Sequence, residues 1–192
     1  MKNDDVVITS AFRTAIGSYN GSLSSKTAPE LGSIVIKKCI ESSELKKEEV
    51  DMVYMGQVLS AGVGQNPARQ ASIYAGLSNT TTNTTINQVC GSGLASVALA
   101  YNAIKCEDSN IIIAGGQESM SNAPSYINVR KGEKINENKI KDTMIIDGLW
   151  DVYNQYHMGM TAENVAKKFN IKREDQDEFA LNSQKKAIKA IK

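Results

Sequence analysis

The sequence predicts an α/β fold with a mostly parallel, mixed sheet, and three observations carry this prediction. Short apolar or β-branched runs alternate with segments of helical periodicity over the first two-thirds of the chain. The run from Ile111 to Gly116 is apolar on both faces, which is typical of a central parallel strand. Of the 192 residues, 41% are hydrophobic and 22% charged, so the chain has enough apolar material for a core and disorder is not expected.

The first strand is expected at Val6 to Ser10, where β-branched residues cluster. The T-x-x-E spacing of Thr27 and Glu30 is that of a capping box and predicts that a helix begins there. The apolar side chains that follow recur at helical spacing: Leu31, Ile34, Val35 and Cys39. Cys39 is therefore expected to be a small core side chain rather than a reactive one.

The second strand is expected at residues 51–56, followed by a glycine-bearing loop. Asn66 then caps a helix with Pro67 at its first position, the preferred order for these residue types. A third strand is expected near residues 82–88. In the segment 90–100 after it, glycines give way to strong helix formers.

The remainder of the chain has a different texture. Residues 117–138 are polar and irregular, which indicates a long excursion from the α/β core. Helical signals return at 161–169 and 174–191, a spacing that resembles a helix-turn-helix, but the acidic opening of the second helix would repel phosphate. The helical period continues to Lys192 without a stop signal, so we expect either a chain cut inside an element or a terminal helix that frays.

Charge and composition exclude several classes of protein. The 22 Lys and Arg residues nearly balance 21 Asp and Glu residues, whereas a nucleic-acid binder carries a basic excess. The apolar runs are far shorter than the roughly 20 residues of a membrane span. The amino-terminal residues have neither a signal core nor an amphipathic presequence, so we expect a cytoplasmic location. The three cysteines contain no C-x-x-C pair, and we expect free thiols and no metal site.

Cys90 is the candidate nucleophile because of its position between a strand and a helix. Gly91 and Gly93 are expected to allow a tight turn and the close approach of a ligand to the backbone. Amides at a helix start stabilise an anion, either a thiolate or the oxyanion of a thioester under attack. A cysteine nucleophile usually has a histidine partner, and the sequence holds a single histidine, His157. The alternative is a tight strand-to-helix connection with a buried, inert thiol.

The segment Asn87-Gln-Val-Cys-Gly-Ser-Gly-Leu94 resembles the active-site segment of thiolases. Four further segments resemble thiolase segments in the same order: 13–18, 64–70, 114–124 and 156–163. The resemblance covers essentially the whole chain but only the amino-terminal half of a thiolase. Residues 148–151 make it most similar to the biosynthetic type, the acetyl-CoA acetyltransferases.

This resemblance implies a thiolase-like fold in two parts. Residues 1–118 would form the amino-terminal α/β core, with four strands, three helices and the nucleophile. Residues 119–192 would form part of the inserted loop domain, which binds coenzyme A and mediates oligomerisation. Many relatives have glycine in place of Glu107, and Ser or Thr in place of Lys172; each departure is expected to cost about 1 kcal/mol of stability.

The resemblance also implies a reaction, in the metabolism of fatty acids and ketone bodies. Cys90 would take the acetyl group of acetyl-CoA, and the enolate of a second acetyl-CoA would attack it to give acetoacetyl-CoA. The Cys90 backbone N–H would donate to the oxyanion, and Leu149, His157 and Met158 would line the channel for coenzyme A and the acyl group. The coenzyme A thioesters are substrates, and no cofactor is expected.

The remaining catalytic groups of the family lie in its carboxy-terminal half: the basic histidine of a Gly-His-Pro motif, a second cysteine and an Asn-Glu-Ala-Phe motif. We therefore expect the chain to be insufficient for turnover alone, and to form a homo-oligomer or to associate with a carboxy-terminal half. Two alternatives stay open. One is a non-catalytic fragment or coenzyme A-binding subunit, and the other is a different condensing enzyme of the superfamily, such as a ketoacyl synthase.

Overall fold

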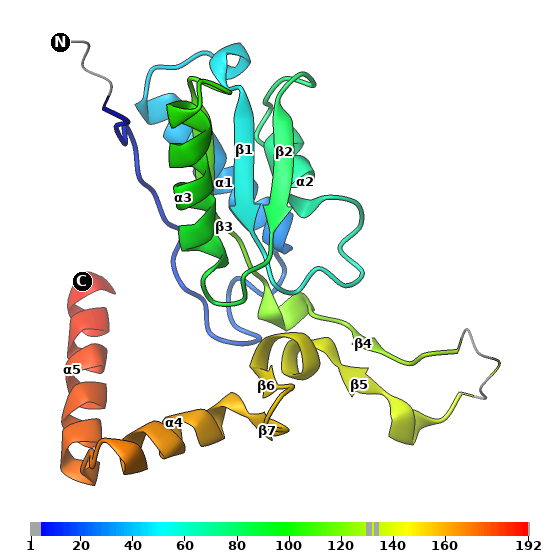
Figure 1. Cartoon of the computed structure of the whole chain (residues 1–192), viewed down its shortest axis with the longest axis vertical. Coiled ribbons are helices and arrows are strands. Elements are labelled where there is room, and N and C mark those ends of the chain that lie inside the picture. Colours follow the sequence, from blue (N-terminus) through cyan, green and yellow to red (C-terminus); the bar gives the residue numbers. More distant parts are fainter. Residues whose placement is uncertain (1–4, 130–131, 133–134, 192) are drawn as a thin grey trace. The chain divides into compact units, whose positions relative to one another are not determined.

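The computed structural model describes residues 5–129, 132 and 135–191 (Figure 1). The chain divides into two compact units, residues 1–148 and residues 149–192, and each is described by itself. Unit 1 contains the α/β sheet, and unit 2 contains a small strand pair and two helices. The boundary predicted between residues 118 and 119 separates the α/β core from the loop domain of the thiolase family. It is a different kind of boundary from the one between these compact units, and it stays a prediction.

The sheet of unit 1 is parallel and has the strand order β2-β1-β3. Its strands are β1 (Met52–Gly56), β2 (Thr82–Ile86) and β3 (Ile112–Gly116). Met52 of β1 is in register with Thr82 of β2 and with Ile112 of β3. The expectation of a central position for the 111–116 run is therefore wrong, because β1 is central and β3 lies at an edge. The run is apolar on both faces because α3 packs on one face and the hydrophobic core on the other.

The expected strand at Val6 to Ser10 is also absent. Within the described residues, 5–18 form neither helix nor strand, and the Val7 and Ile8 side chains are 71% and 79% exposed. A strand needs a neighbour for its backbone groups. Here a groove of about 440 Å³ separates residues 6–12 from β3, so β-branched residues alone do not produce a strand.

Three helices of unit 1 begin where the sequence predicts: α1 (Ala28–Ser42), α2 (Pro67–Tyr74) and α3 (Ser92–Lys105). The capping box before α1 is complete, because the Thr27 side chain accepts from the Glu30 N–H while the Glu30 carboxylate accepts from the Thr27 N–H. The Asn66 side chain accepts from the Arg69 N–H at the start of α2.

The hydrophobic core lies between the sheet and the helices α1 and α2, while α3 covers the opposite face (Figure 1). Ile36 of α1 and Val53 of β1 are fully buried in this core. The buried stripe of α1 runs through Ile36 and Ile40, so Ile34 is half exposed and Cys39 only partly buried. The predicted helix is confirmed, but its buried face is centred on Ile36 and Ile40 rather than on the predicted Ile34 and Cys39.

The rest of unit 1 consists of short elements. The strand pair β4 (Ser125–Tyr126) and β5 (Lys141–Asp142) is antiparallel. The described residues also form three 3₁₀ helices, η1 (Lys47–Glu49), η2 (Met120–Asn122) and η3 (Glu137–Lys139). The π-helix η4 (Met144–Leu149) ends on the first residue of unit 2.

Unit 2 begins with an antiparallel pair, β6 (Trp150–Asp151) and β7 (Tyr156–His157). The helices α4 (Met158–Lys168) and α5 (Arg173–Ile191) follow, as the sequence predicts. Within the part of the chain that the structure describes, no helix is both long enough and apolar enough to cross a membrane.

Candidate active site

Cys90 lies in the short connection between β2 and α3, two residues before the first residue of the helix. Its side chain is exposed, so the alternative of a buried thiol in this connection is wrong. The helix that follows is 14 residues long, and its first amides have no partners within the helix. A thiol at this position can therefore react with a substrate while the helix start stabilises negative charge.

The backbone turns at Val89, immediately before Cys90. Val89 has a φ of 49°, a left-handed conformation that is unusual for a β-branched residue. Such a conformation costs on the order of 1–3 kcal/mol and persists only where the surroundings hold it. Gly91, by contrast, has an ordinary φ of −83°, so the turn does not depend on the glycines that the sequence suggested.

Two polar side chains hold this turn. The Asn87 Oδ1 accepts from the Val89 N–H at 3.0 Å. The Ser92 hydroxyl accepts from the Gln88 N–H at 2.9 Å and donates to the Val89 carbonyl at 2.6 Å. Ser92 is only 4% exposed, so its hydroxyl is shielded from competing water. The strained Val89 is thus hydrogen-bonded through both its N–H and its carbonyl group.

Gly56 at the end of β1 lets the start of α3 approach the sheet. A Cβ added to Gly56 would lie 2.5 Å from the carbonyl carbon of Ser92. This distance is too short for a side chain to fit without a shift of the backbone. A Cβ on Gly93 would meet its nearest neighbours only at 3.9 Å. The glycine required for close packing is therefore Gly56, for which the sequence holds no local signal.

Glu118 is a partly buried carboxylate just after β3. Its two oxygens accept from the backbone N–H groups of Val58 at 2.8 Å and Leu59 at 3.2 Å. Burial raises the pKa of Glu118, and the two hydrogen bonds oppose that rise without cancelling it. Sequence reasoning missed Glu118; an acidic residue directly after a buried strand was the available signal.

Two buried glutamines connect the ends of β1 and β3. The Gln117 Nε2 donates to Gln57 Oε1 at 2.9 Å and to the Pro67 carbonyl at 3.2 Å. Gln57 in turn donates to the Leu59 carbonyl at 2.9 Å. These bonds fix the loop after β1 in place beside the Cys90 turn.

The other predicted site residues, Leu149, His157 and Met158, belong to unit 2. Leu149 ends the π-helix η4. His157 is the N-cap of α4, and its Nδ1 accepts from the Gly159 N–H at 3.0 Å. This bond leaves Nε2 as the nitrogen that can face a ligand. Met158 is the first residue of α4 and is 38% exposed. Unit 2 thus brings His157 and Met158 together, while Cys90 belongs to unit 1.

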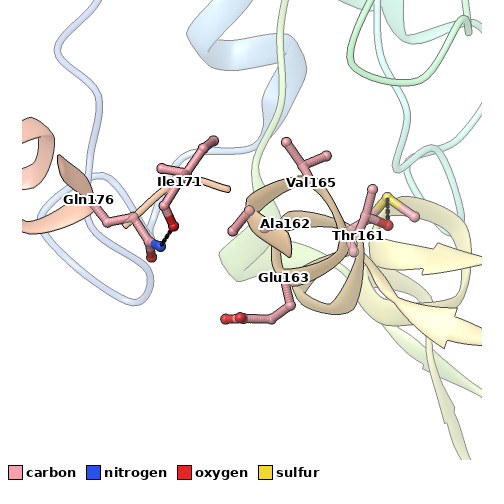
Figure 2. A pocket seen from close by; sticks show the side chains of 8 residues that line it. Thr161, Ala162, Glu163, Val165, Ile171 and Gln176 are labelled. Carbon is pink, nitrogen blue, oxygen red and sulfur yellow. Dashed lines mark hydrogen bonds between the residues drawn. The ribbon is translucent and has the colours of Figure 1, made fainter. Parts of the chain in front are cut away.

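A pocket of about 480 Å³ lies in unit 2, between α4 and the start of α5. Figure 2 shows the side chains that line it. Its wall is largely apolar and includes Met158, Val165 and Ile171. At its rim the Gln176 side chain donates to the Ile171 carbonyl at 3.4 Å. Across the described residues, no group of three or more His, Cys, Asp or Glu side chains is placed to hold a metal ion.

Comparison with known proteins assigns the family. The family described as "Thiolase, N-terminal domain" matches residues 6–192. The chain is 59% identical over 189 residues to the acetyl-CoA acetyltransferase of Cupriavidus necator, and this alignment covers 98% of the chain and 48% of that protein. It is 54% identical over 188 residues to the acetyl-CoA acetyltransferase of Pseudomonas aeruginosa, covering 97% of the chain and 48% of the relative.

A third relative, the acetyl-CoA acetyltransferase of Escherichia coli, is 52% identical over 193 residues, covering all of the chain and 48% of that protein. The chain therefore spans about half the length of the curated relatives it matches. The matched region includes the Cys90 turn, the Glu118 loop and both helices of unit 2. On these grounds the chain belongs to the thiolase family and has the α/β fold of its amino-terminal domain.

Proposed function

We propose that this chain carries the nucleophile of an acetyl-CoA acetyltransferase, and that the nucleophile is Cys90. The observation that carries the proposal is the exposed Cys90 thiol at the start of α3. It follows a strained turn at Val89, whose N–H and carbonyl are both hydrogen-bonded. The relatives that share this segment over the whole chain are named acetyl-CoA acetyltransferases. The same names favour this reaction over that of a ketoacyl synthase.

The proposed reaction has two acyl transfers through one intermediate. The Cys90 sulfur attacks the thioester carbonyl of acetyl-CoA, the C–S bond to coenzyme A breaks, and the released thiolate takes a proton. A base then removes a methyl proton from a second acetyl-CoA. The resulting enolate carbon attacks the carbonyl of the acetylated Cys90 and displaces the Cys90 thiolate, which takes up a proton, and acetoacetyl-CoA is formed. The Cys90 backbone N–H is the oxyanion donor that this chain would supply. Leu149, His157 and Met158 are the residues proposed to line the channel for coenzyme A and the acyl group.

We further propose that turnover requires groups from the half of the relatives that this chain does not span. The outer face of α3 in unit 1 supports the proposal of a partner. It is formed by Leu94, Val97 and Tyr101, whose side chains are 78%, 39% and 49% exposed. An apolar face of this kind favours association with a second protein surface. A carboxy-terminal thiolase half is the proposed partner, and self-association into a homo-oligomer is the alternative. A cytoplasmic role in fatty acid and ketone body metabolism goes with this proposal.

Reconstitution tests the proposal. The chain would be assayed for thiolysis of acetoacetyl-CoA alone, and again after mixing with the carboxy-terminal half of the Cupriavidus necator relative. We expect no turnover from the chain alone and turnover from the mixture, which Cys90→Ala abolishes. Ordinary thiolase rates from the chain alone would contradict the requirement for a second half, and activity that survives Cys90→Ala would contradict the assignment of the nucleophile.

A further inference from the structure

The end of β3 is linked to the Cys90 turn by a continuous set of hydrogen bonds. The Glu118 carboxylate accepts from the Val58 N–H at 2.8 Å. On the other side of the same residue, the Val58 carbonyl accepts from the Asn87 Nδ2 at 3.5 Å. The Asn87 Oδ1 then accepts from the Val89 N–H at 3.0 Å. The last bond reaches the left-handed residue that directly precedes Cys90.

We propose that Asn87 and Glu118 are positioning residues for the Cys90 nucleophile and act together through the backbone of Val58. This inference rests on the proposed function of Cys90 and assigns two residues that would support it. Neither residue touches the thiol in the described contacts. Each acts by fixing the backbone from which Cys90 projects.

The physical argument begins with the strain at Val89. A β-branched residue leaves the left-handed region unless its peptide groups are held, and Asn87 supplies the acceptor for its N–H. Asn87 is itself exposed, so its carboxamide needs a second contact to keep one rotamer. The Val58 carbonyl is that contact. Glu118 holds Val58 and Leu59 together, so that the carbonyl stays in the position where Asn87 can reach it.

The consequence concerns the direction of the Cys90 side chain. When Val89 relaxes to a negative φ, the peptide that leads into Cys90 rotates, and the sulfur moves relative to the amides at the start of α3. The thiolate then loses part of the stabilisation that the helix start provides, and its reaction with an electrophile slows. Asn87 and Glu118 are therefore expected to control the reactivity of Cys90 specifically.

The test is the rate of alkylation by iodoacetamide, measured separately for each cysteine of the intact chain by peptide mass mapping. Cys106 at the far end of α3 is an exposed reference thiol in the same molecule, and partly buried Cys39 reports general loosening of the fold. We expect Asn87→Ala and Glu118→Ala each to slow the alkylation of Cys90 about fivefold, the factor expected for the loss of one hydrogen bond. The rates of Cys39 and Cys106 should stay unchanged. Glu178→Ala in the exposed part of α5 is the matched control and should change none of the three rates.

The double variant Asn87→Ala/Glu118→Ala separates linked from independent action. Because both substitutions interrupt the same chain of bonds, the double variant should be no slower than the slower single variant. A Cys90 rate equal to the product of the two single effects, or rates of all three thiols that change together, would overturn the proposal. If Glu118→Ala does not fold, Glu118→Gln is the second variant, because it keeps one acceptor oxygen. It should slow the alkylation of Cys90 less than Asn87→Ala does. A Glu118→Gln effect larger than that of Asn87→Ala would also overturn it.

This test is independent of the proposed function because iodoacetamide needs no coenzyme A site. If Cys90 accepts no acetyl group but the variants slow its alkylation, the function fails and the positioning stands. If Cys90 accepts an acetyl group and the variants leave its alkylation unchanged, the positioning fails and the function stands.

Discussion

At the scale of single residues, the site depends on how closely α3 approaches the end of β1. Gly56 faces the Ser92 backbone, where an added Cβ would lie 2.5 Å from the Ser92 carbonyl carbon. We predict that Gly56→Ala lowers the free energy of unfolding by about 1–3 kcal/mol, because the start of α3 must shift to make room. Urea denaturation measures this change. Gly93→Ala is the control and should stay within about 1 kcal/mol of wild type, because its Cβ would make only ordinary van der Waals contacts with Gly116, at 3.9 Å, and alanine favours the helix. Equal losses for both variants would contradict the packing argument.

Glu118 gives a second prediction at this scale, from pH dependence. Burial raises its pKa above the ordinary value of 4.5, so the folded protein binds this proton more tightly than the unfolded chain does. The contribution of Glu118 to the free energy of unfolding is therefore largest below the unfolded pKa and falls as the pH rises through the folded pKa. Glu118→Gln removes this dependence, so the stability of wild type relative to Glu118→Gln should fall as the pH is raised from 4.5. Urea denaturation over a pH series measures the difference, and a difference that grows with pH would contradict the account.

The sequence could single out Cys90 as the candidate nucleophile, but not the residues that hold its backbone. Cys90 is marked by local features, namely its neighbours and its place between a strand and a helix. Val89, Gly56 and Glu118 acquire their roles only when three strand ends meet in space. For Glu118 the one local signal is an acidic residue soon after an apolar strand, and the immediate sequence of Val89 and Gly56 carries none. Gly91 and Gly93 illustrate the reverse error, because a local reason existed for a turn that the fold makes at Val89 instead.

At the scale of elements, the end of α3 carries an energetic defect. Glu107 has a φ of 61°, and the Asp108 N–H bonds the Ala103 carbonyl at 3.0 Å, which is the Schellman pattern that favours glycine. Glu107 therefore has the left-handed conformation in which a residue other than glycine costs stability. We predict that Glu107→Gly raises the free energy of unfolding by about 0.5–1 kcal/mol, measured by urea denaturation. Asp108→Gly is the control and should lower the free energy of unfolding, because Asp108 has no positive φ. A Glu107→Gly variant that is less stable than wild type would contradict this account.

The start of α5 shows how a predicted defect can be relieved. Lys172 provides no cap of the Ser or Thr kind, but its own N–H is accepted by the Asp175 carboxylate at 3.2 Å. This is half of a capping box, supplied from within the first turn of the helix. The helix begins where the sequence predicts, and the cost expected of Lys172 at its N-cap stays a prediction.

Helices were predicted more accurately than strands for a physical reason. The caps at Thr27 and Asn66 are local, so their residues determine where α1 and α2 begin. A strand depends on its neighbours, and in the described part of the chain residues 6–10 pair with no strand. The position of β3 at the edge could likewise not be predicted from the sequence, because packing over the whole sheet decides the strand order.

At the scale of the whole molecule, exposed apolar surface should govern the behaviour of unit 1. The outer face of α3 presents Leu94 at 78% exposure together with Val97 and Tyr101. We predict that the chain associates as its concentration rises and that Leu94→Lys reduces this association. Size-exclusion chromatography with light scattering over a concentration series measures it. Val152→Lys, at an apolar side chain that is 57% exposed in unit 2, is the control and should leave association unchanged. A monomer at all concentrations would contradict the prediction.

The most direct measurement of the central claim is the acetylation of Cys90 by acetyl-CoA. The intact chain would be incubated with acetyl-CoA, digested and mapped by mass spectrometry, with Cys90→Ala as the control. The account predicts an added acetyl group on the Cys90 peptide, none on the Cys39 or Cys106 peptides, and none in the variant. A chain that leaves Cys90 unmodified, or acetylates all three cysteines equally, would contradict the claim that Cys90 is the nucleophile and would favour a non-catalytic subunit.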